Sequence, residues 1–150
     1  MNLLPAPVVI LNDGQEDGIF IAPDAFTFLS NFGSEFTDFF AAKGFNLSRL
    51  AGAKVLTIGG LSASDYIDEI ARNCSGNYLD HGVRVNSVLS TYLLNDNQIL
   101  QRFGDLAASN FLTQTSLTFS VTLVNSTSVE TVEVPFVASF IGNSFTDGQS

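Results

Sequence analysis

The stretch that decides the fold class is AKVLTIGGLSASDYIDEIA, residues 53–71. Its first six residues form a short β-branched run that ends at the turn pair Gly59-Gly60. Ser62 is placed to cap a following helix, with an acidic residue three positions later as its reciprocal partner. Apolar residues then recur at helical spacing. The stretch therefore predicts a strand, a glycine turn and a helix over residues 62–72.

The last third of the chain predicts a β-hairpin over residues 116–138. Apolar residues alternate with Thr and Ser over 117–123, and apolar residues alternate again over 131–136. The polar segment 125–128 is the expected turn. Pro135 has no N–H to donate, so the second strand is expected at a sheet edge, or to end there.

The N-terminal part predicts a second hairpin. An apolar run over 7–11 is followed by the acidic, glycine-containing segment 12–18 and then by the apolar residues 19–21. The acidic segment could indicate calcium binding, but it lacks the alternating acids and terminal Glu of an EF-hand loop. A solvated hairpin turn is the favoured interpretation.

A phenylalanine-rich helix is expected over residues 24–42, with Asp24 as its N-cap. Its Phe residues recur every three to four positions, which predicts a core-facing stripe more strongly than a ligand-binding one. Gly33 weakens this helix by about 1 kcal/mol, and Gly44 is the expected stop.

The middle of the chain is the least regular part. Residues 74–84 predict a loop, helical spacing returns over 85–93, and residues 95–115 predict a long loop. The chain is interpreted as a single domain over 1–141, with 142–150 as a linker or tail.

These elements together predict an α+β fold with a small, partly antiparallel sheet and at least two helices. The side chains expected in the core come from the two predicted helices, over 24–42 and 62–72, and from the C-terminal hairpin. They are Phe28, Phe32, Phe36, Ile67, Ile70, Phe119, Val121, Val132 and Val134.

Composition narrows the choice of partners. Only 14% of the residues are charged, and the net charge is −9, from 15 acidic and 6 basic residues. Nucleic acid and anionic membrane surfaces need a basic patch, and the sequence has no Lys/Arg cluster. No apolar run reaches the roughly 18 residues of a membrane span. A polar surface built from Ser, Thr and Asn suits a secreted β-rich protein.

The sequence contains no self-contained catalytic site, and no metal or cofactor site, that we can identify. His81 is the single histidine and stands without a Gly-x-Ser-x-Gly motif, so a surface histidine is favoured over a catalytic base. Lys43 and Lys54, the only lysines, have no serine at a recognisable spacing. Cys74 is the single cysteine; it cannot form an internal disulfide, and with one histidine it cannot build a zinc site.

Three N-glycosylation sequons begin at Asn46, Asn73 and Asn125. A chain of this composition contains about two by chance, so the number is no evidence of secretion. Asn125, in an expected turn, and Asn46 are the candidate acceptors.

The segment over residues 50–67 resembles the strand–turn–helix of PDZ-like domains. The order of segments is similar to the PDZ-like module of fungal tail-specific (C-terminal-processing) serine peptidases, relatives of the chlamydial protease-like activity factor. The similar segments are 18–23, 51–71, 80–87 and 116–138. The resemblance implies a PDZ-like sheet or barrel with flanking helices.

The resemblance also implies a function without catalysis in this chain. In that family the module accompanies a separate Ser–Lys catalytic domain, and it recognises substrate tails or gates the active site. The expected partner is therefore a peptide or protein segment, which includes a segment of the parent's own catalytic domain, bound by β-augmentation. No binding residue is carried over. The alternatives are a secreted structural or adhesive β-rich module and, last, a small hydrolase that uses His81.

Overall fold

An antiparallel sheet lies at the centre of the computed structural model, which describes residues 2–109 and 114–138. Its strand order is β10-β9-β4-β3-β2, and β5 pairs with β4. The strands are β2 (Val8–Asn12), β3 (Asp17–Ile21), β4 (Lys54–Ile58), β5 (Leu61–Ser62), β9 (Ser116–Thr122) and β10 (Val129–Pro135). Because β2 and β10 remain edge strands, the sheet is open; of the two expected forms, sheet or barrel, the structure has the sheet.

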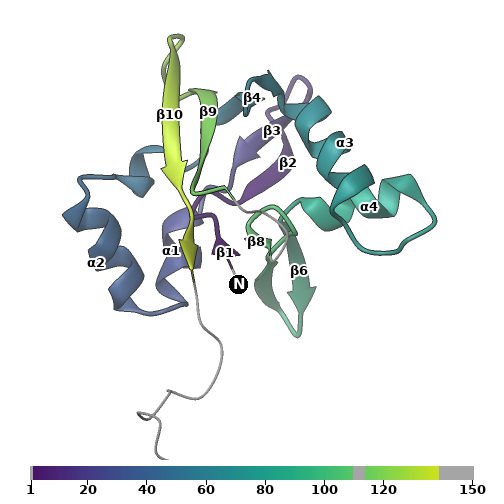
Figure 1. The fold of residues 1–150 in the computed structure, drawn as a ribbon, viewed down its shortest axis with the longest axis horizontal. Helices are drawn as coiled ribbons and strands as arrows, with labels where there is room; N and C mark the ends of the chain where they lie inside the picture. The colour runs from purple at the N-terminus through teal and green to yellow at the C-terminus, as the bar shows by residue number, and fades with distance from the viewer. Residues whose placement is uncertain (1, 110–113, 139–150) are drawn as a thin grey trace, which may run out of the picture.

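Helices lie on both sides of this sheet in Figure 1. One pair is α1 (Ala25–Ser30) and α2 (Ser34–Ala42), followed by the 3-10 turn η1 (Leu47–Arg49); the other pair is α3 (Ala63–Asn73) and α4 (His81–Val88). A small sheet joins β1 (Asn2–Leu3), β8 (Ala108–Ser109) and β11 (Val137–Ala138). Strands β6 (Thr91–Asn95) and β7 (Gln98–Arg102) form a separate hairpin. The predicted α+β class is confirmed.

Both predicted hairpins are confirmed. β9 and β10 pair in register from Thr122 opposite Val129 to Ser116 opposite Pro135, and β10 is an edge strand that ends at its proline. β2 and β3 pair in the same way, and their acidic turn satisfies its own polar atoms. Asp13 Oδ1 accepts the backbone N–H groups of Gln15 and Glu16 at 3.0 and 3.1 Å. The N–H groups of Glu16 and Gln15 hold the pKa of the Asp13 carboxyl below its usual value.

The single helix expected over 24–42 is wrong, because the structure has two helices with a break between them. Gly33 adopts φ 119° and ψ 156°, a conformation that side-chain-bearing residues avoid, so the chain turns instead of continuing. The predicted stop at Gly44 is confirmed: its φ is 69°, and the next residue, Phe45, donates its N–H back to the Phe40 carbonyl at 2.9 Å.

The predicted helix over 62–72 is confirmed as α3, and its cap is formed as expected. Ser62 Oγ accepts the backbone N–H of Asp65 at 3.2 Å. The loop expected over 74–84 is partly wrong, because α4 begins at His81. Asp80 caps that helix by accepting the N–H of Val83 at 3.0 Å.

Substituting Ser62 tests how much this cap stabilises the protein. We expect Ser62→Ala to lower the free energy of unfolding by about 0.5–2 kcal/mol, because the Asp65 N–H loses its acceptor at the helix start. Ser62→Gly should cost only a few tenths of a kcal/mol, since glycine is itself a good capping residue. Urea denaturation measures both; equal losses for the two variants would contradict a capping role.

The long loop expected over 95–115 is also wrong in its first part. Residues 98–102 form β7, and the turn that joins it to β6 has positive φ at Asp96 and Asn97, 46° and 64°. Two successive left-handed residues define the tight turn that favours a two-residue hairpin. Residues 110–113 of this expected loop and the expected tail over 142–150 lie outside the described residues.

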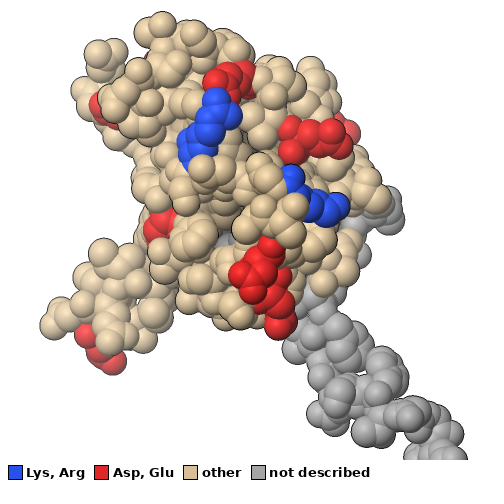
Figure 2. Space-filling model, turned by 90° about the vertical axis from the view of Figure 1, so that its left-hand side faces the viewer, with Lys and Arg blue, Asp and Glu red and all other residues tan. Residues whose placement is uncertain are grey.

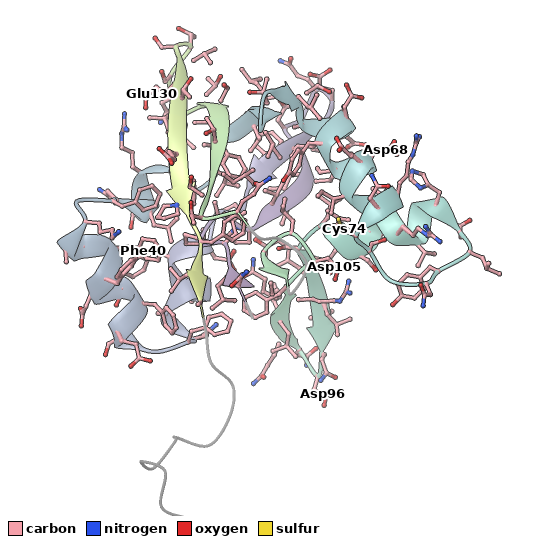
Figure 3. The ribbon with its side chains drawn as sticks, viewed as in Figure 1. Phe40, Asp68, Cys74, Asp96, Asp105 and Glu130 are labelled. Carbon is pink, nitrogen blue, oxygen red and sulfur yellow. The ribbon has the colours of Figure 1, made fainter. Side chains whose placement is uncertain are left out.

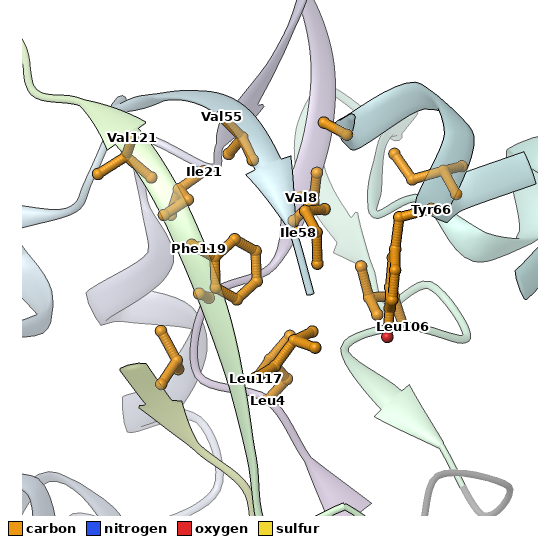
Figure 4. Packing of buried hydrophobic residues seen from close by; sticks show 14 of the residues in the cluster. Leu4, Val8, Ile21, Val55, Ile58, Tyr66, Leu106, Leu117, Phe119 and Val121 are labelled. Atoms are coloured by element: carbon orange, nitrogen blue, oxygen red, sulfur yellow. The ribbon is translucent and has the colours of Figure 1, made fainter. Parts of the chain in front are cut away.

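The core lies between the sheet and the helices (Figure 4). Five of the predicted core side chains are buried: Ile67, Ile70, Phe119, Val121 and Val134. Phe32, Phe36 and Val132 are only partly buried, and the side chain of Phe28 lies outside the description. None of the described helices has the length and apolar character needed to cross a membrane.

Candidate functional site

A hollow of about 210 Å³ lies between β2–β3 and the helix pair α3–α4, which we call the edge pocket. Its apolar wall comes from Ile10, Ile19, Ile67, Val85 and Leu89. Ser64 and Asp68, one helical turn apart on α3, contribute the polar part of the wall. The strands bring Ile10 and Ile19 together as directly opposite residues. The pocket is thus an apolar hollow next to an edge strand.

Part of the β2 backbone is open on the side away from β3. Ala22 donates its N–H to the Pro7 carbonyl at 2.8 Å, so the alternation of an antiparallel ladder directs residues 7, 9 and 11 toward β3. The polar backbone groups of Val8, Ile10 and Asn12 therefore face outward. The Val8 carbonyl accepts from Ser90 at 2.9 Å. No described residue hydrogen-bonds the N–H or C=O of Ile10.

Asp68 connects the two helices at the rim of the edge pocket (Figure 3). Its Oδ2 forms an ion pair with Arg72 at 2.8 Å, one turn along α3, and its Oδ1 bonds His81 Nε2 at the start of α4. Arg84 also fixes this end of α4, because its Nε donates to the Tyr78 carbonyl at 2.5 Å. The carboxylate therefore has two basic neighbours, and the helix pair has a defined separation.

The Asp68–His81 pair has two of the three groups of a hydrolytic triad. Both side chains are partly exposed, at 36% and 47%. Among the described residues, no serine, cysteine or lysine side chain hydrogen-bonds His81. Ser64 lies on the same face of α3 as Asp68, but its Oγ contacts Ser62 Oγ at 3.3 Å. Asp68 therefore orients the imidazole of His81, but no described nucleophilic side chain lies within hydrogen-bond distance of it.

The other chemically interesting side chains are engaged elsewhere. Cys74 is half-buried at the C-terminal end of α3. Lys43 Nζ lies 4.9 Å from the centre of the Phe39 ring, and Lys54 Nζ lies 3.2 Å from Glu16 Oε1. The structure brings neither lysine to the edge pocket. Within residues 2–109 and 114–138 there is no cluster of three or more His, Cys, Asp or Glu side chains arranged to hold a metal ion.

The sequon asparagines are accessible. Asn46, Asn73 and Asn125 are all exposed, and Asn125 lies after the end of β9 with φ 60°. A second hollow, of about 350 Å³, lies between α1, α2 and η1 and is lined by Phe26, Phe40, Phe45 and neighbouring residues, including Asn46. Its lining residues come from helices and loops and include no strand residue, so it lacks the strand backbone groups found at Ile10.

Charged side chains are sparse on the face that carries β10 and α2. Figure 2 shows isolated acidic and basic groups on an otherwise uncharged surface. One basic group there, Arg49, is paired: its Nη2 lies 2.6 Å from Glu130 Oε1. This face offers no concentrated charge for a partner.

Comparisons with protein-family models, with curated proteins and with solved structures found no match to this chain. The resemblance to PDZ-like modules therefore stays a prediction. The edge pocket, with the open backbone beside it, is the feature of the chain from which a function is best argued.

Proposed function

We propose that this chain is a non-catalytic recognition module that binds an extended peptide segment along β2. The observation that carries the proposal is the outward-facing backbone of Ile10, which no described residue hydrogen-bonds, directly beside the edge pocket. A segment in β-conformation would donate to and accept from Ile10 and become an additional strand of the sheet. Recognition by strand addition combines such backbone hydrogen bonds with side-chain pockets.

The edge pocket supplies the specificity of this recognition. Successive side chains of a strand point to opposite faces, so only alternate residues of the bound segment reach the pocket. Its five aliphatic lining residues favour a Val, Ile or Leu side chain. Complete burial of such a side chain contributes about 1.5–3 kcal/mol, which is enough to select one position of the segment.

Charge favours a neutral or basic segment. The chain carries −9, and Asp68 lies at the pocket rim. Because Asp68 is already paired with Arg72 and His81, the attraction is mainly the long-range one of an acidic protein, and added salt should weaken it.

In a longer parent protein, the segment is a substrate tail or part of a separate Ser–Lys catalytic domain. We further propose a secreted location, which the low content of charged residues supports.

Peptide selection followed by titration tests the proposal. We expect a displayed library of random decapeptides to yield binders with one aliphatic position flanked by β-favouring and basic residues. For a fluorescein-labelled binder, Ile10→Pro should weaken binding about tenfold or more, because proline removes one outward N–H. A tenfold change in affinity corresponds to about 1.4 kcal/mol. Since that N–H makes no bond to β3, the β2–β3 ladder should survive the substitution.

Two controls separate the possible results. Ile10→Ala keeps the N–H and removes only the side chain, so it should weaken binding less than Ile10→Pro. Val129→Ala alters an exposed residue on the opposite edge strand and should leave binding unchanged. Unchanged binding by Ile10→Pro would refute strand addition at β2. Peptide turnover by the purified chain that Ser64→Ala or His81→Ala abolishes would refute the non-catalytic function.

A further inference from the structure

The β6–β7 hairpin projects from the rest of the molecule (Figure 1), and its sequence places apolar side chains on both faces. It pairs with no other described strand. Leu93 is 59% exposed, Leu94 70% and Ile99 74%, so the hairpin carries three of the more exposed aliphatic side chains in the described chain. A two-stranded hairpin is marginally stable by itself in water, and exposed apolar clusters commonly mark interfaces.

The base of the hairpin is held firmly. The Tyr92 hydroxyl donates a hydrogen bond to Oδ1 of Asp24, the residue that precedes α1, at 2.7 Å. Burial, together with this bond to Asp24, raises the pKa of the Tyr92 hydroxyl. After β7, Asp105 donates its N–H to the Ser87 carbonyl at 2.8 Å. The two strands therefore leave the body in a fixed direction and present their outer edge to solvent.

The outer edge of β6 has free backbone groups. The two-residue turn places Asn95 opposite Gln98 as the closing hydrogen-bonded pair, so Thr91, Leu93 and Asn95 face β7. The N–H and C=O of Tyr92 and Leu94 therefore point away from the hairpin. No described residue hydrogen-bonds these four backbone groups.

Within the described residues, this edge has none of the features that usually prevent strands from pairing. Such features are lysines, prolines, bulges or a covering element. β6 reads Thr-Tyr-Leu-Leu-Asn, without a charge or a proline, and its register with β7 is regular throughout. Figure 3 shows Asp96 at the far tip of the hairpin, away from the middle of β6.

We propose that two copies of this chain associate through β6, in antiparallel pairing about a two-fold axis at Leu93. The outward groups favour one register, in which Tyr92 exchanges hydrogen bonds with the partner's Leu94 and the reverse, because this register satisfies all four outward groups. Leu93 then lies directly opposite the partner's Leu93. As Leu100 is the β7 neighbour of Leu93, one face of the four-stranded sheet becomes a continuous row of four leucines.

Charge favours a second copy over a different, charged protein. Asp96 and Arg102 are the only charged residues between 91 and 102, so the hairpin is neutral and the net charge of −9 lies outside it. A charged partner would find nothing complementary on this surface. Antiparallel pairing also places the acidic remainder of each chain at opposite ends of the four-stranded sheet, where the repulsion between the two copies is weakest.

Analytical ultracentrifugation of the whole chain tests the proposal. We expect a concentration-dependent dimer that Leu93→Lys weakens by roughly a hundredfold or more, because two ammonium groups would replace two buried leucines. Leu93 is exposed in the single chain, so this variant should fold normally. Val129→Lys is the matched control: Val129 has the same 59% exposure on another edge strand, and the dimer should persist.

A cysteine variant tests the register. In a Cys74→Ser background, Leu93→Cys should form a disulfide-linked dimer under mild oxidation. Leu93 and the partner's Leu93 would form a non-hydrogen-bonded antiparallel pair, in which the Cα atoms are about 4.5 Å apart. Asn95→Cys should not form this disulfide, since it would lie opposite the partner's Thr91. A chain that stays monomeric up to about 1 mM, a dimer insensitive to Leu93→Lys, or equal cross-linking of the two cysteine variants would overturn the proposal.

Discussion

Truncation of Phe119 to Ala is expected to lower the free energy of unfolding by about 3–5 kcal/mol. The ring is completely buried, and it points from β9 into the core cluster (Figure 4). Its cross-strand neighbours are Ile58 on β4 and Val132 on β10, so three strands enclose it. Removal of the ring therefore loses apolar burial and leaves a cavity that the surrounding strands cannot fill.

Urea denaturation measures this loss through the midpoint and the slope of the transition. Val129→Ala serves as the control, because its side chain is 59% exposed, and a change within about 0.5 kcal/mol is expected there. Phe36→Ala should cost less than Phe119→Ala, since Phe36 is only partly buried. A loss below about 1 kcal/mol for Phe119→Ala would show that this ring is not part of a packed core.

The parts of the fold that could be predicted from the sequence are those set by local chemistry. Strict alternation defined β9 and β10, and the cap at Ser62 defined the start of α3. Pro135 was expected to mark either an edge or an end, and β10 is an edge strand that ends there, because a missing N–H is a property of one residue. In these segments the local pattern and the tertiary contacts favour the same structure.

The errors arose where one residue had two interpretations. Gly33 was interpreted as a weak position inside a helix, whereas its positive φ makes it the break between α1 and α2. Asp96 and Asn97 were interpreted as loop residues, although asparagine and aspartate tolerate the left-handed conformation that a tight turn requires. The Asp96-Asn97 pair could have predicted the β6–β7 turn. That prediction also required residues 98–102 to be recognised as a strand.

The edge pocket could be predicted only in outline. Binding by β-augmentation was expected, but the strand and the pocket residues were not, because Ile10, Asp68 and Val85 come from three distant segments. Nothing local to Ile10 indicates that its backbone faces outward. That property follows from the strand order, which places β2 at the end of the sheet, and from its pairing with β3.

Substitution of Gly104 should have the other large effect, because at this position the backbone of one segment touches that of another. A Cβ atom at Gly104 would lie 2.2 Å from the Val88 carbonyl oxygen and 2.4 Å from the carbonyl carbon and oxygen of Leu89. These are backbone atoms, which cannot rotate away as a side chain can. Gly104→Ala is therefore expected to lower the free energy of unfolding by about 3 kcal/mol or more.

The two segments have little freedom to separate. Asp105 donates its N–H to the Ser87 carbonyl at 2.8 Å, and Leu106 donates its N–H to the Val88 carbonyl at 3.2 Å, directly after Gly104 in the chain. An added methyl group must stretch or break these bonds. Since they also fix the base of β6–β7, amide exchange at Asp105 and Leu106 should become faster in the variant, ahead of exchange in β9.

Gly14→Ala provides the control that separates steric overlap from backbone strain. Gly14 has φ 95° but no atom within 4 Å of an added Cβ, so its substitution tests strain alone and should cost about 1–2 kcal/mol. Gly104 is the opposite case: its φ is not positive, and an added Cβ would overlap with the backbone of Val88 and Leu89. Unfolding measurements that rank Gly14→Ala as the more damaging variant would contradict close backbone packing at Gly104. Accelerated exchange at Leu106 in Gly104→Ala alone would locate the damage at the base of the hairpin.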